Sequence, residues 1–201
     1  GNETVSGIVK DFGFAKKTLM SEHRLPQRLI NFVADLVGEK NVPKSVINDE
    51  NPVKRYVIGR DTSDIAGSIS EDVKSSVNSG EPVSSHLVVT RTNEQAKIIA
   101  AALKAAGVPS IAVTDREHID KMVASGQLTA EQADMMVEQE KKILDEGNVV
   151  PVQTAHTAGG KEAKRVYAYI PENPLKDDET RQLTGIMMSR VAESGSLNLY
   201  T

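Results

Sequence analysis

A short stretch near the carboxyl end of the chain combines hydroxyl, imidazole and carboxylate side chains with glycines. An apolar stretch ends in Thr154-Ala-His156-Thr157, a glycine turn leads to Glu162, and a second apolar stretch follows at residues 165–170. Hydroxyl groups, an imidazole and backbone amides at the end of a strand can hold the phosphates of a single nucleic-acid strand. The sequence therefore predicts phosphate-binding chemistry where this strand ends.

Two features that triphosphate hydrolysis usually needs are missing from the sequence. No Gly-x-x-x-x-Gly-Lys-Ser/Thr loop occurs to cradle a triphosphate, and no acidic pair follows a strand to hold magnesium. The histidines are scattered without the paired spacing of metal ligands, so we expect no metal site. They are His23, His86, His118 and His156.

Composition and charge limit the class of protein. With 201 residues and 39% hydrophobic content, the chain can bury one adequate core, so we expect one domain. Neither a membrane-spanning stretch nor a signal peptide is evident, and zero cysteines make a cytoplasmic location the expectation. The net charge of −4 argues mildly against a nucleic-acid partner, although a local groove of amides and a few cations can bind phosphates on an acidic protein.

Strands and helices are predicted to alternate along the chain. The helical spacing of apolar residues predicts helices at 24–37, 64–78 and 93–106. Asn93 is expected to cap the third of these helices, and Gly107 to end it. Short apolar runs predict strands at 53–58, 86–90, 110–114, 149–155 and 165–170. This order is the signature of a parallel sheet covered by helices.

Residues 115–147 interrupt the alternation. Helical patterns at 117–124 and 129–145 flank a Ser-Gly pair, which predicts a helical hairpin that projects from the sheet. Met135 and Met136 are expected to pack within the hairpin and the charged run after them to be solvated, with a partner-binding role as the less favoured alternative.

The remaining segments complete the predicted domain. A last helix is expected at 178–193, followed by a last strand at 197–200. Residues 1–18 have no clear element and are interpreted as a connecting segment before a single domain at 19–201.

Four segments, in order along the chain, resemble the motifs of a known family. They are residues 19–30, 87–97, 154–162 and 186–191. This succession resembles motifs IV, IVa, V and VI of superfamily 1 DNA helicases of the UvrD/Rep type. The resemblance implies an α/β fold with a RecA-like parallel sheet flanked by helices, as in a P-loop NTPase-like second domain that lacks its own P-loop, with the helical hairpin as an insertion.

The same resemblance implies a function. The chain would be the C-terminal motor domain of an ATP-dependent DNA helicase or translocase that binds single-stranded DNA. ATP and magnesium would bind only together with an upstream RecA-like domain of the same protein, so this chain alone is expected to be inactive as an enzyme.

The resemblance also assigns roles on the nucleotide side. Arg24 and Arg190 would be catalytic arginine fingers on the γ-phosphate, on one face at the carboxyl edge of the sheet and near Glu162. Glu162 would accept a hydrogen bond from the ribose hydroxyl, and Gly160 belongs to the turn that presents it. His23 stands where the family usually has a tyrosine that stacks on adenine. The alternative for each side chain is a solvated surface position, with Arg190 paired to a neighbouring carboxylate on its helix.

Two short runs resemble the family's contacts to DNA. These are Arg91, Thr92 and Asn93 at motif IVa, and Thr154, His156 and Thr157 at motif V. A plain helix cap is an alternative interpretation of the Thr-Asn pair. Both can hold at once, because a capped helix still offers its remaining amides to a phosphate.

Departures from the family pattern support a second hypothesis. The lysine of the motif V turn is displaced to Lys161, directly before Glu162, and His23 replaces the tyrosine. Together with the acidic charge, these departures favour a vestigial helicase-like domain, as in conjugative relaxases, used for DNA binding or protein docking without catalysis. Retention of both arginines and of Glu162 favours the active motor.

Overall fold

The computed structural model describes residues 31, 53–158, 161–171, 179, 186–187 and 190–201 of the chain. The predicted connecting segment and the predicted helix at 24–37 lie outside this part, except for Asn31, which is helical. The boundary at residues 18–19 therefore stays a prediction.

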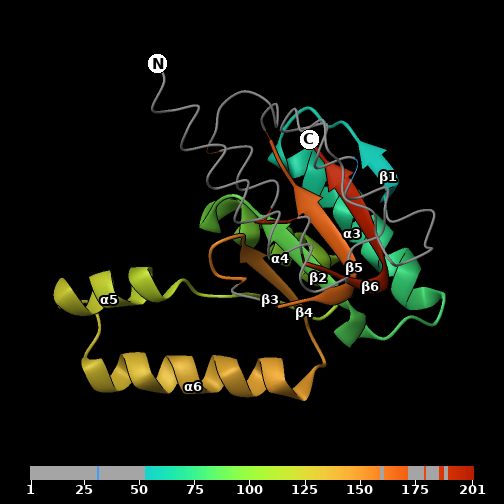
Figure 1. The fold of residues 1–201 in the computed structure, drawn as a ribbon. Helices are drawn as coiled ribbons and strands as arrows, with labels where there is room; N and C mark the ends of the chain where they lie inside the picture. The colour runs from blue at the N-terminus through green and yellow to red at the C-terminus, as the bar shows by residue number, and fades with distance from the viewer. Residues whose placement is uncertain (1–30, 32–52, 159–160, 172–178, 180–185, 188–189) are drawn as a thin grey trace.

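Six parallel strands form one sheet in the part of the chain that the structure describes (Figure 1). The strands are β1 (Val53–Val57), β2 (His86–Thr90), β3 (Ser110–Ala112), β4 (Val150–Thr154), β5 (Ala163–Tyr169) and β6 (Val191–Tyr200). Their order across the sheet is β1-β6-β5-β2-β4-β3. Because every pair is parallel, all carboxyl ends lie at one edge of the sheet and all amino ends at the other.

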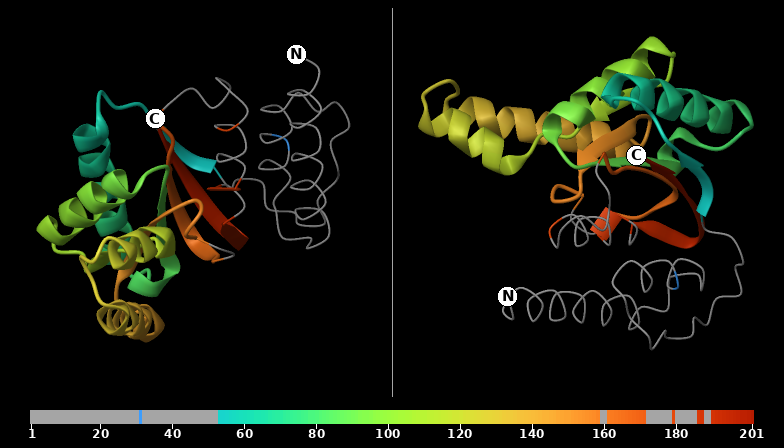
Figure 2. Two further views of the ribbon diagram at one scale, coloured as in Figure 1. Left: turned by 90° about the vertical axis from the view of Figure 1, so that its left-hand side faces the viewer. Right: turned by 90° about the horizontal axis from the view of Figure 1, so that it is seen from above.

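Helices α3 (Thr62–Asn78) and α4 (Asn93–Ala105) cover one face of this sheet (Figure 2). In α3, Ile65, Ile69 and Val73 repeat at every fourth residue and are buried against apolar side chains of the strands, including Val88 and Val152. The single-turn 3-10 helix η1 (Val83–Ser85) leads from α3 into β2.

The opposite face of the sheet carries a second apolar core. Leu87 and Val89 point there, whereas Val88 between them belongs to the core under the two helices. Ile186 and Met187, both helical, pack against this second core. A strand that is buried on both faces has no polar alternation, which explains the continuous apolar run in β2. The predicted α/β class, a parallel sheet flanked by helices, is confirmed.

A row of stacked rings lies beneath α3. The ring centroids of His86 and Tyr167 are 6.1 Å apart, and those of Tyr167 and Tyr200 are 6.4 Å apart. The Tyr200 hydroxyl donates to a carboxylate oxygen of Asp72 at 2.6 Å, and Asp72 also pairs with Arg55 at 3.0 Å. Burial raises the pKa of Tyr200, so its hydroxyl remains a donor that ties the last strand to α3.

Helices α5 (Arg116–Ala124) and α6 (Ala130–Glu146) form a hairpin, hereafter the arm, that projects from the β3 side of the sheet (Figure 1). The turn between the helices contains Gly126 with φ of 77°, a backbone conformation that favours glycine. Within the two helices, Ile119 and Ala133 are the buried residues. The predicted hairpin is thus confirmed, and it has little core of its own.

Two predicted boundaries near the strand ends are wrong by one or two residues. The cap of α4 is Thr92, whose hydroxyl accepts from the Gln95 amide at 3.2 Å, and Asn93 is the first helical residue. Strand β3 ends at Ala112, because the amide of Thr114 donates to the carboxylate of Glu140 on the arm and not to a neighbouring strand.

The predicted last helix extends too far. Residues 191–193 belong to β6, which begins at Val191 opposite Ala163 of β5. A bulge makes the start of β6 unrecognisable in the sequence. Ala163 to Arg165 on β5 lie opposite Val191 to Ser196 on β6, so the two-residue alternation of a regular strand is lost. Gly195 lies in this bulge.

Candidate functional site

The ends of β2 and β4 bring the two predicted DNA-contacting runs together. These strands are neighbours, with Thr90 opposite Thr154, and the amide of Ala155 donates to the carbonyl of Thr90 at 3.0 Å. The residues that follow, 91–93 and 155–157, therefore lie side by side at the carboxyl edge. The sequence-based expectation that Thr154, His156 and Thr157 lie at a strand end is met.

The turn after β4 is held by its own hydroxyl groups. The hydroxyls of Thr154 and Thr157 lie 2.8 Å apart, and the amide of Thr157 donates to the Thr154 hydroxyl at 3.2 Å. Thr154 is buried with 5% of its surface exposed, whereas His156 is exposed between them. Thr154 thus shapes the turn, and His156 is the side chain of the run that can reach a ligand.

The loop after β2 is organised by a capping box. The side-chain oxygen of Gln95 accepts from the amides of Arg91 and Thr92, each at 3.2 Å, while Thr92 accepts from Gln95 in return. Thr92 therefore caps α4, and any contact of Thr92 or Asn93 with DNA would be made at this capped helix start. Contact with a phosphate here would use the amides of the first helical turn and the guanidinium of Arg91.

A third strand end at this edge connects to the arm. Glu140 of α6 accepts from the amide of Thr114 at 3.1 and 3.2 Å and from its hydroxyl at 2.7 Å. This contact could not be predicted from the sequence, since 26 residues separate the partners and a glutamate within a helix has no pattern of its own. The contact fixes the arm to the carboxyl end of β3.

Glu162 and Arg190 lie together, but at the other edge of the sheet. Each directly precedes a strand, and the amide of Ala163 donates to the carbonyl of Arg190 at 2.9 Å. The expectation that they lie at the carboxyl edge is wrong, because residues that precede parallel strands all lie at the amino edge. The expected proximity of Arg190 to Glu162 is met. Arg190 is also not on a helix but in the turn before β6, where its amide donates to the carbonyl of Met187.

The surroundings of Arg190 combine burial with one negative charge. The side chain is half-buried, and its Nε atom has no hydrogen-bond partner among the residues that the structure describes. Burial lowers the pKa of the guanidinium, and the charge of Glu162 acts in the opposite direction. A cation held in this way is oriented by the fold and retains an unused donor.

Three predicted nucleotide-side residues lie outside the described residues. These are His23, Arg24 and Gly160. The expected pairing of Arg24 with Arg190 therefore stays a prediction. Of the residues near Gly160 that the structure describes, 155–158 form the turn after β4 and 161–162 directly precede β5.

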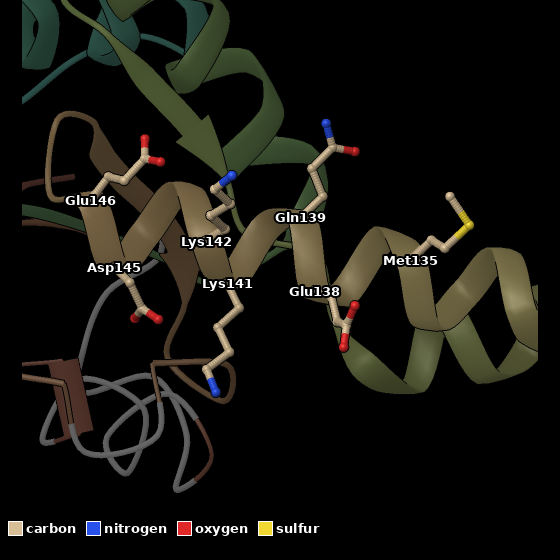
Figure 3. Close-up of a pocket in the computed structure, with 7 residues that line it drawn as sticks. All are labelled: Met135, Glu138, Gln139, Lys141, Lys142, Asp145 and Glu146. Carbon is tan, nitrogen blue, oxygen red and sulfur yellow. The ribbon is translucent and has the colours of Figure 1, made fainter.

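A shallow hollow on the arm does not form an enclosed small-molecule site. Figure 3 shows its lining side chains in two rows along the single helix α6, with Met135 at one end. Because one helix supplies both rows, the hollow cannot surround a ligand. In the described part of the chain, no group of three or more His, Asp or Glu side chains could hold a metal ion. No described helix is long and apolar enough to cross a membrane.

Comparisons with known proteins define the class of fold. No protein-family model matches the chain, and no curated protein sequence matches it. Solved structures do match, and one of them is the C-terminal domain of a possible DNA helicase from Lactobacillus plantarum WCFS1. The similarity has a TM-score of 0.55 at 13% sequence identity and covers 89% of this chain and 86% of that chain. The fold is therefore similar to that of a helicase C-terminal domain.

Proposed function

We propose that this chain is the C-terminal RecA-like motor domain of a superfamily 1 DNA helicase or translocase of the UvrD/Rep type. The observation that carries the proposal is the placement of the loops after β2 and β4. Two runs that resemble the family's DNA contacts, residues 91–93 and 154–157, are far apart in sequence and lie side by side at one edge of the sheet.

Single-stranded DNA would bind along the carboxyl edge. The chemistry available there is the guanidinium of Arg91, the exposed imidazole of His156 and the amides at the start of α4. The residues outside the arm have a slight positive balance, because residues 115–146 alone carry nine carboxylates against four Lys and Arg side chains. The acidic charge of the chain is thus concentrated on the arm.

ATP and magnesium would be held by an upstream RecA-like domain. On this chain, Glu162 would accept a hydrogen bond from the ribose, with Gly160 in the same turn and His23 next to the base. Arg190, together with Arg24, would stabilise negative charge on the γ-phosphate. The half-buried guanidinium of Arg190 beside Glu162 supports this nucleotide role. Its Nε donor has no hydrogen-bond partner among the described residues.

A vestigial helicase-like domain is the second candidate function. It is favoured by the position of Lys161, whose side chain is exposed in the turn and displaced from the family's position. Such a domain would bind DNA or a protein partner, and Arg190 would remain permanently neutralised by Glu162.

The proposal is tested by titrating the chain with a fluorescent single-stranded oligonucleotide and following anisotropy. We expect weak binding at low salt that falls as salt rises. Arg91→Ala should weaken binding roughly tenfold and lower the salt slope by about one. The control Lys104→Ala, at the far end of α4, should change affinity by less than about twofold. Absence of binding by the unmodified chain would overturn the DNA-binding role.

A further inference from the structure

The distal half of α6 presents an apolar side chain beside a row of carboxylates. Glu131, Asp134, Met135 and Glu138 are spaced at i, i+3, i+4 and i+7, so they share one face of the helix, and all four are exposed. We call these four residues the acidic methionine face. Met135 is 65% exposed, and its neighbour Met136 is 41% exposed. Methionine has an unbranched, adaptable side chain that suits a binding surface.

The charge on this face has one sign. Residues 130–140 contain four carboxylates and neither Lys nor Arg. One of the four, Glu140, is occupied by Thr114, which leaves the three carboxylates of the acidic methionine face toward solvent. Lys141 and Lys142 follow toward the other end of α6, and Asp145 and Glu146 come after them. The charge along the hollow is therefore negative at Glu138, positive at the two lysines and negative again beyond them (Figure 3).

Among the residues that the structure describes, no further layer covers the apolar side chains of the arm. Besides Ile119 and Ala133, the apolar residues of the two helices are only half-buried or exposed. The half-buried set is Met122, Val123, Val137, Ile143 and Leu144. A helical hairpin with this exposure gains stability when a further helix packs against it.

We propose that the acidic methionine face docks a basic amphipathic helix of a partner protein. An apolar anchor on the partner would cover Met135, and its Lys or Arg side chains would pair with Glu131, Asp134 and Glu138. A second copy of this chain is the less suitable occupant, because two such faces would place like charges against each other. Nucleic acid is disfavoured by the same charges. The proposal does not depend on the DNA-binding or nucleotide roles proposed above.

The test uses the full chain and two designed peptides of about 18 residues, long enough to form a helix on the surface. One carries Leu at i, i+3, i+4 and i+7 with Lys elsewhere, and the other carries Glu in place of Lys. Isothermal titration should show binding of the Leu/Lys peptide and none of the Leu/Glu peptide. Met135→Ser, and separately the triple change Glu131→Gln, Asp134→Asn and Glu138→Gln, should each weaken binding at least about tenfold.

A matched control separates this site from general attraction between opposite charges. Neutralising three exposed carboxylates outside the arm, with Glu71→Gln, Glu94→Gln and Glu179→Gln, should change the affinity by less than about threefold. If both triple variants weaken binding equally and Met135→Ser has no effect, the proposal is overturned. It is also overturned if light scattering shows a dimer of the unmodified chain that Met135→Ser converts to a monomer, since the occupant is then a second copy. Circular dichroism of each variant checks that α6 is intact.

Discussion

At the scale of single residues, Gly195 is required by a close approach of two backbones. A Cβ atom at this position would lie 2.7 Å from the carbonyl oxygens of both Ala192 and Lys164. Neither oxygen can move without disturbing the bulge that joins β5 and β6. We expect Gly195→Ala to lower the free energy of unfolding by roughly 1–3 kcal/mol, measured by urea denaturation.

Gly67 offers the matched control for this substitution. It lies within α3, where a Cβ atom would meet no other atom within 4 Å. Gly67→Ala should stabilise the chain by roughly 0.5–1 kcal/mol, because alanine loses less conformational freedom in a helix. Equal effects of the two changes would contradict the bulge geometry.

His86 is a second residue whose environment gives a measurable effect. It is 1% exposed, its Nδ1 atom lies 2.8 Å from the carbonyl of Pro82, and its Nε2 atom lies 2.8 Å from the Ser76 hydroxyl. A neutral ring protonated on Nδ1 satisfies both contacts, donating to Pro82 and accepting from Ser76. Burial lowers the pKa of His86, and Arg165 acts in the same direction, while Glu81 and the backbone contacts oppose them.

The lowered pKa sets the sign of a pH dependence. The unfolded chain binds more protons than the folded chain between the folded pKa and the ordinary value of 6.5. Stability from the neutral ring is therefore full above pH 6.5 and is lost as the pH falls below it. The urea midpoint should decrease from pH 7.5 to pH 5.5, and His86→Gln should flatten this decrease. The exposed His118→Gln should leave it unchanged, and an equal response of both variants would refute the assignment to His86.

At the scale of elements, the contact between Thr114 and Glu140 should control how firmly the arm is held. Glu140→Ala removes the carboxylate that accepts hydrogen bonds from the amide and the hydroxyl of Thr114, and leaves that amide without this acceptor. We expect a local loss of roughly 1–2 kcal/mol, seen as a 5- to 30-fold faster hydrogen exchange in α6 near residue 140. Glu138→Gln, two residues away and exposed on another face of α6, is the control and should leave the exchange unchanged. A uniform increase across the sheet would instead indicate global unfolding.

The elements also show what the sequence could and could not predict. Strands and helices from residue 53 to residue 154 were predicted to within two residues, because apolar spacing and caps are local signals, as in α3 with its Asp61 cap. The start of β6 was missed because the bulge at Gly195 removes the two-residue period that identifies a strand. The Thr114–Glu140 contact joins elements 26 residues apart and leaves no local trace.

For the same reason, only some residues of the candidate site could be placed from the sequence. Side chains that follow strands, such as His156, could be placed at a sheet edge from the strand order alone. The edge at which Arg190 lies could not be predicted in this way, since it depends on where β6 begins. That Thr154 turns its hydroxyl toward Thr157 is a feature of the turn geometry, which residue types alone do not determine.

At the scale of the whole molecule, the last prediction concerns catalysis. The sequence contains neither a phosphate-binding loop nor an acidic pair after a strand for magnesium, and the described residues include no group of three or more His, Asp or Glu side chains that could hold a metal ion. Arg190 can stabilise charge on a phosphate only where another domain positions the phosphate and the metal. We therefore expect the purified chain to release no phosphate from ATP above background, with or without single-stranded DNA. Turnover by this chain would sink the proposal that it is one half of a two-domain motor. In the full-length protein, Arg190→Ala should abolish ATP turnover and leave DNA affinity within about threefold, because Arg190 lies at the amino edge and the proposed DNA contacts at the carboxyl edge.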